Sequence, residues 1–234
     1  MKTRLTATAT DAAMVMVACA LLLTVAFGAI GRRGAATQGE LSPIRVLIDP
    51  GHGGADGGAV AADGTEEKGL NLAISLPLRD LLQVMGYEVA MTRDADIMVN
   101  TEGTTLRERK VSDLKNRLAM SREADVTISI HQNKFPQAQY YGTQVFYSDN
   151  HSKSREIAAA VRDSVLRLLQ PKNTRELKKG DSSVYLLSHA ETPMVLVECG
   201  FLSNEAELQQ LKDTDYQRKM AFAIMGGLMS GEDV

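Results

Sequence analysis

The chain has 234 residues, a net charge of −3 and an apolar share of 44%. These values are typical of a globular protein with one domain of ordinary size, and they exclude an intrinsically disordered chain. An acidic chain without tryptophan is a poor match for the phosphates and stacked bases of nucleic acid, so we expect no nucleic-acid partner.

The N-terminal segment contains an uncharged apolar run over residues 12–30, with basic residues on both sides. The run is nearly long enough to cross a membrane and is longer than the hydrophobic part of most secretory signals. We therefore expect residues 1–38 to be a signal anchor and linker, with a cleaved signal peptide as the alternative. A buried core helix is disfavoured by the terminal position. Residues 39–234 would then form an extracytoplasmic domain, either membrane-anchored or secreted.

Apolar runs and helical periodicity alternate along residues 39–234. Strands are expected at 45–50, 87–93, 125–133, 143–148 and 194–201, with a shorter one at 183–188. Helices are expected at 67–85, 111–124, 154–169, 205–211 and 214–229. This alternation predicts an α/β fold, with a mostly parallel (mixed) sheet of about six strands and helices on both faces.

Three segments of this domain carry more specific expectations. Residues 94–110 are polar and are expected to be irregular, and the helix at 111–124 is expected to use Val111, Leu114 and Leu118 as its buried face. The basic segment 171–181 reads as a solvated turn.

Four polar residues fall where these elements begin or end. His52 follows the first strand, Glu67 opens the next helix, and His131 and Glu198 end later strands. If the strands are parallel, all four lie at the carboxyl edge of the sheet, where open α/β sheets place their ligands. Two histidines and one carboxylate are the ligand set of a catalytic zinc, and Glu198 is then available as general base and acid.

Each of these residues also has a structural explanation. His52 is alternatively a surface loop residue, Glu67 an anion at a helix N-terminus, and His131 a hydrogen-bonded core residue. Glu198 interrupts an apolar strand, so its structural alternative is a buried ion pair with an arginine. Cys199 should point to the opposite face of that strand and serve core packing.

The motifs as a set resemble a known family. In chain order, "IDPGHGGADGGAV", "EK" at residues 67–68, "MTRDAD", "SIHQN" and "VLVECGFLSN" resemble the zinc-dependent N-acetylmuramoyl-L-alanine amidases. The resemblance implies one zinc ion held by His52, Glu67 and His131, with Glu67 rather than Glu66 as the carboxylate ligand. It further implies Glu198 as the catalytic residue and Asn133 as a residue that binds substrate or supports the site.

Within the family, the chain resembles germination-specific amidases of spore formers most closely. The grounds are the short N-terminal segment, "LRERKVSDLKNR" and the lack of an added wall-binding repeat. This resemblance implies peptidoglycan as substrate, hydrolysis of the amide between the muramic lactyl group and L-alanine, and a first step toward muramic-δ-lactam in spore cortex. A forespore location and an accessory protein are possible on this basis. The alternatives are a vegetative wall amidase, another wall zinc peptidase and a non-catalytic wall-binding module.

Overall fold

The computed structural model describes residues 43–232. They belong to a compact unit that begins at Pro43. The expected anchor and linker over residues 1–38 lie outside the described residues and stay a prediction, as does the start of the domain at residue 39. No helix in the described part of the chain is both long enough and apolar enough to cross a membrane.

The described strands form one six-stranded mixed sheet in the order β2-β1-β3-β6-β4-β5. Four of them are parallel: β1 (Arg45–Pro50), β2 (Glu88–Met91), β3 (Val126–Asn133) and β6 (Met194–Phe201). Two run the other way: β4 (Gln144–Tyr147), which pairs antiparallel with β6, and β5 (Lys178–Lys179). Successive residues of β1 from Val46 to Ile48 are all buried, because both faces of the sheet are covered.

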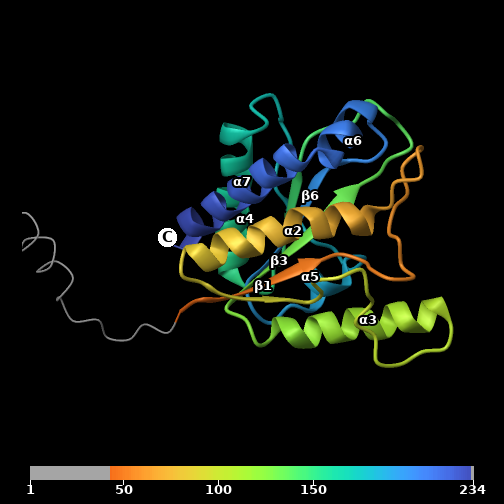
Figure 1. The fold of residues 1–234 in the computed structure, drawn as a ribbon. Coiled ribbons are helices and arrows are strands. Elements are labelled where there is room, and N and C mark those ends of the chain that lie inside the picture. Colours follow the sequence, from red (N-terminus) through yellow and green to blue (C-terminus); the bar gives the residue numbers. More distant parts are fainter. Residues whose placement is uncertain (1–42, 233–234) are drawn as a thin grey trace, which may run out of the picture. The chain divides into compact units, whose positions relative to one another are not determined.

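Helices cover the two faces in separate groups (Figure 1). One face carries α2 (Glu67–Val84), α4 (Ser152–Leu168) and α7 (Thr214–Glu232), and α6 (Glu205–Lys212) adds Leu208 and Leu211 to the same hydrophobic core. The other face carries α3 (Leu106–Ser121) and α5 (Tyr185–His189) over a smaller core. The predicted fold class is confirmed.

Helix α3 differs from its prediction in its length and in part of its buried face. It begins at Leu106, because Thr105 and Glu108 form a reciprocal capping box, so residues 106–110 are helical rather than irregular. Val111 is 49% exposed, whereas Asp113 and Arg117 are buried. The expected apolar face was therefore wrong at Val111, whereas Leu118 is buried and Leu114 packs against the smaller core as expected. The buried face also carries an ion pair between Arg117 and Asp113.

One shorter segment was assigned wrongly, and another contains a short strand that was not expected. Residues 183–188 were expected to form a strand, but Tyr185–His189 form helix α5, with Leu186 and Leu187 in the smaller core. Periodicity cannot separate strand from helix in so short an apolar run. The segment 171–181 contains the edge strand β5, whose two exposed lysines suit the unpaired edge of a sheet.

Candidate metal centre and active site

The parallel strands bring the four predicted site residues to one edge of the sheet. His131 and Glu198 are direct partners in the register of β3 and β6. β1 ends at Pro50 beside Ile130, so His52 follows just beyond the same edge, and Glu67 is the first residue of α2. The carboxyl ends of β1, β3 and β6 thus supply three of the four residues.

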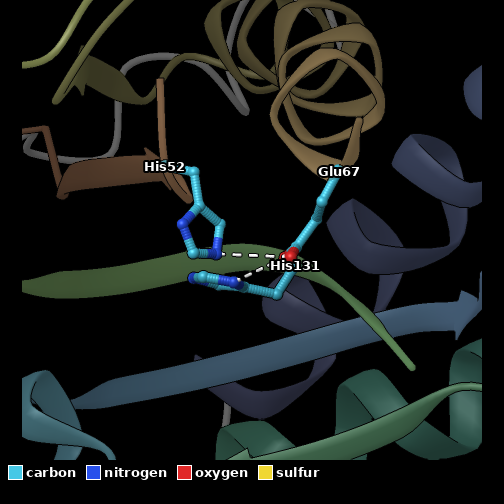
Figure 2. Close-up of side chains that lie close together, drawn as sticks. All are labelled: His52, Glu67 and His131. Atoms are coloured by element: carbon cyan, nitrogen blue, oxygen red, sulfur yellow. Dashed lines mark hydrogen bonds and ion pairs between the residues drawn. The ribbon is translucent and has the colours of Figure 1, made fainter. Parts of the chain in front are cut away.

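Three of these residues converge on one point (Figure 2). His52 Nε2 lies 3.3 Å from Glu67 Oε2, and His131 Nδ1 lies 2.9 Å from Glu67 Oε1. One candidate ligand atom from each residue lies within 4.8 Å of the others. Glu66 instead directs its carboxylate to Lys68, 3.3 Å away, so Glu67 is the glutamate that joins the histidines.

The loop between β1 and α2 has an uncommon backbone conformation at His52. Its φ of 62° makes it the only non-glycine residue with positive φ among the described residues, and such strain persists where the surroundings impose it. A Cβ on Gly51 would lie 2.2 Å from His131 Cε1, and one on Gly58 would lie 2.6 Å from Glu67 Oε2. The glycine-rich sequence is therefore needed where the backbone passes against the candidate ligands.

Asp56 orients the imidazole of His52. Its Oδ2 lies 2.8 Å from His52 Nδ1, while Lys110 binds its other oxygen at 2.9 Å. A protonated Nδ1 held by a carboxylate leaves Nε2 free as a metal ligand, which is the usual arrangement around metal-binding histidines. Burial alone would lower the pKa of His52, but Asp56 and Glu67 raise it to about 9. The site therefore stabilises positive charge.

Glu67 is buried and remains ionised. Its Oε2 accepts a hydrogen bond from the Ala59 amide and its Oε1 one from the Gln132 amide. Burial alone would raise its pKa, but the hydrogen bonds and charges of His131 and His52 hold that pKa well below its usual value. An ionised carboxylate between two imidazoles is a suitable donor set for zinc.

Glu198 is in a different environment from Glu67. Its Oε2 is buried and has no hydrogen-bond partner among residues 43–232. Burial raises its pKa to about 7; Glu67 acts in the same direction, while the charges of His131 and His52 oppose the rise. No arginine pairs with it in the described part of the chain, so the structural alternative for Glu198 is not found there. A carboxyl group with a pKa near neutral can both accept and donate a proton.

Two buried arginines support the His52 loop, and the sequence analysis missed both. Arg117 donates to the carbonyl oxygens of Pro50 and His52 at 2.8 Å and 2.7 Å. Arg93 donates to the carbonyl oxygens of Pro50 and Gly51, both at 2.9 Å. Three successive carbonyls of the strained loop are thereby satisfied. The available signal was the Asp113–Arg117 spacing of one helical turn, which places two charges on one face of α3.

Three further residues with polar or sulfur-containing side chains lie outside the group of converging ligands. Asn133 is half-buried at the end of β3, and its side chain forms no hydrogen bond with another residue in the range 43–232, so its amide is available to a ligand. His189 is exposed on α5 and stacks on Tyr185. Cys199 is fully buried in the larger core, as predicted.

The family described as N-acetylmuramoyl-L-alanine amidase matches residues 46–230. The chain belongs to this family. This amidase is 37% identical over 192 residues to the germination-specific N-acetylmuramoyl-L-alanine amidase of Bacillus subtilis, a match that covers 81% of this chain and 80% of the relative. The predicted family and enzyme class are confirmed.

Solved structures agree with this assignment. The CwlD amidase from Clostridioides difficile, solved in complex with the GerS lipoprotein, matches with a TM-score of 0.78 and 39% identity, covering 81% of this chain and 98% of that one. The amidase AmiC2 of Nostoc punctiforme matches with a TM-score of 0.70 and 28% identity, covering 82% of this chain and 98% of that one. The amidase domain described here therefore has the fold of solved family members.

Proposed function

We propose that this amidase is zinc-dependent and that His52, Glu67 and His131 hold one zinc ion. The support is the convergence of two imidazoles and an ionised carboxylate on one point, with ligand atoms within 4.8 Å of one another. Two nitrogen donors and one oxygen donor are a ligand set that catalytic zinc sites use. Zinc is favoured over redox-active metals because hydrolysis needs no electron transfer.

The reaction that this proposal assigns is hydrolysis of the amide between the muramic lactyl group and L-alanine in peptidoglycan. When bound, zinc supplies Lewis acidity that polarises a carbonyl and acidifies water. Glu198 takes a proton from the attacking water as a carbon–oxygen bond forms. It then delivers that proton to the alanine nitrogen as the carbon–nitrogen bond breaks. The products are a lactyl carboxylate and a stem peptide with a free amine.

The single observation that carries this role for Glu198 is its buried, unpartnered Oε2 next to His131 in the strand register. A buried carboxyl oxygen that lacks a partner is costly and therefore calls for a functional explanation. We assign Asn133 to substrate binding, because it ends the same strand as His131 with a free side-chain amide. This assignment is separate from the catalytic one.

The biological setting that we propose is spore cortex, where the product would be the precursor of muramic-δ-lactam. The support is the similarity to the germination-specific relative and to the CwlD amidase. Because the latter was solved with a lipoprotein, we extend the proposal to an accessory protein for this chain. Residues 1–38 would anchor or export the domain, which would act outside the cytoplasmic membrane, in spore formers within the forespore intermembrane space.

The test is mass spectrometry of a muropeptide digest by the zinc-loaded chain beside Glu198→Gln. We expect free stem peptides with an unblocked L-alanine amine, and none from the variant. Shortened peptides still attached to sugar would instead identify a wall peptidase. Binding without cleavage by the zinc-loaded wild type, also in the presence of a candidate partner, would favour a wall-binding module. Full activity of Glu198→Gln would overturn the proposed mechanism.

A further inference from the structure

Asn71 is a fully buried polar residue one turn after Glu67 on α2. Its side-chain nitrogen donates to the Gly51 carbonyl at 3.1 Å and to Glu67 Oε1 at 3.3 Å. Its side-chain oxygen accepts a hydrogen bond from Gln132 Nε2 at 3.1 Å. One amide therefore uses both of its donor hydrogens and its acceptor.

These three partners belong to the three segments that carry the candidate metal ligands. Gly51 directly precedes His52, Glu67 is itself a ligand, and Gln132 directly follows His131. The loop, the helix and the strand are distant in sequence, since Asn71 is 20 positions from Gly51 and 61 from Gln132. Asn71 thus joins all three segments through one side chain.

The chemistry of the three contacts requires an amide. An aspartate lacks the two donors, and an apolar residue of similar size lacks both donors and acceptor. A metal site needs its ligands held to within about 0.5 Å by residues whose own positions are fixed by packing and hydrogen bonds. Full burial and three hydrogen bonds fix Asn71 in this way.

We propose that Asn71 is a positioning residue that sets the distances among His52, Glu67 and His131 and thereby the zinc affinity of the site. The inference rests on the proposed function, because it takes these three residues as the zinc ligands. Partners that orient metal ligands typically contribute 10- to 100-fold to metal affinity. We expect a loss in this range when the Asn71 amide is removed.

The experiment is a titration of the full chain with zinc against a competing chelator, for wild type, Asn71→Ala and Ser75→Ala. Ser75 is a matched control, because it lies one turn further along α2, is equally buried, and its Oγ has no hydrogen-bond partner within the described residues. We expect about 10- to 100-fold weaker binding for Asn71→Ala and an unchanged affinity for Ser75→Ala. Cobalt(II) in place of zinc should show an altered visible absorption spectrum only in Asn71→Ala, because that spectrum reports ligand geometry.

Different outcomes test the positioning role of Asn71 and the zinc site itself. If wild type binds no zinc, the proposed function fails. If wild type binds one zinc and Asn71→Ala binds it equally well, or if Ser75→Ala loses as much affinity, the positioning role is overturned while the zinc site stands. Unfolding in chelator shows whether each variant folds. Should Asn71→Ala not fold, Gln132→Met, which removes one of the three contacts, takes its place, and wild-type zinc affinity in that variant would overturn the inference.

Discussion

The guanidinium of Arg117 lies 2.6 Å from the carboxylate of Asp49, and both side chains are almost completely buried beneath the His52 loop. The same guanidinium binds Asp113 and two loop carbonyls, so a single cation compensates two buried carboxylates. Burial alone would raise the pKa of Asp49, but Arg117 holds it below the usual value. The loop that carries a candidate ligand therefore depends on a charge network outside the site.

We expect Arg117→Met to be strongly destabilising. Removing one partner of a buried ion pair leaves an uncompensated charge, which costs about 3–5 kcal/mol of unfolding free energy. Urea unfolding of the chelated protein measures this loss. Arg122→Met is the control, because Arg122 pairs with Glu191 at the surface, where such pairs contribute about 1 kcal/mol or less. Equal losses in the two variants would contradict a special role for the buried network.

We expect Gly51→Ala to weaken zinc binding and Gly69→Ala to stabilise the folded protein. The new Cβ at residue 51 would lie 2.2 Å from the His131 ring, so the ring must move and zinc affinity should fall by more than about tenfold. Gly69 lies in α2 with nothing within 4 Å of an added Cβ, so alanine there should stabilise the helix by about 0.5–1 kcal/mol. Zinc titration and urea unfolding check both. A Gly51→Ala variant with wild-type affinity would show that the close packing is unimportant.

We expect zinc to stabilise the folded chain through His131. Ligand at 100 times its dissociation constant adds about 2.7 kcal/mol to the unfolding free energy of a protein that binds it only when folded. His131→Ala should lose this increment. His189→Ala, a change at an exposed histidine, should retain it. Thermal unfolding with zinc and with chelator measures the increment, and an equal zinc response in all three proteins would argue against His131 as a ligand.

We expect Glu198 to make the chelated protein less stable as pH rises. Its folded pKa of about 7 exceeds the usual 4.5, so the folded state binds more protons than the unfolded state between these values. The unfolding free energy therefore falls through this window as pH increases. Glu198→Gln should remove that part of the pH dependence, whereas a change at exposed Glu123 should leave it. Urea unfolding at pH 5 and pH 7.5 tests the difference, and parallel pH curves for wild type and Glu198→Gln would refute it.

Much of the fold followed from the sequence because its strands are short, apolar and separated by periodic helices. The expectation that these strands run parallel then placed His52, His131 and Glu198 at one edge of the sheet, and the structure has them there. The fold class, family and enzyme class are confirmed, while the metal role of His52, Glu67 and His131 and the catalytic role of Glu198 remain proposals.

The contacts that support the site could not be predicted from local sequence patterns, because they join residues that are distant in sequence. Arg117 reaches Asp49 across 68 positions, and Asn71 reaches Gln132 across 61. A polar residue in a helix is taken to be solvent-exposed as long as its distant partner is unknown, which is why Asp113 and Arg117 were not expected on the buried face of α3. The candidate ligands and Glu198 could be recognised in the sequence motifs. The residues that hold them in place could be recognised only in the tertiary structure.

The register between β3 and β6 has a consequence for any preparation of this protein. Glu198 stands beside His131, while its neighbours Val197 and Cys199 point into the larger core. Because side chains alternate along a strand, a slip of one residue would place Cys199 beside His131 and drive the carboxylate of Glu198 into apolar packing. A mispaired molecule would thus be less stable and would lack the arrangement of Glu198 and His131. An incorrectly paired fraction of a preparation would therefore count as protein but would lack Glu198 at its place beside His131.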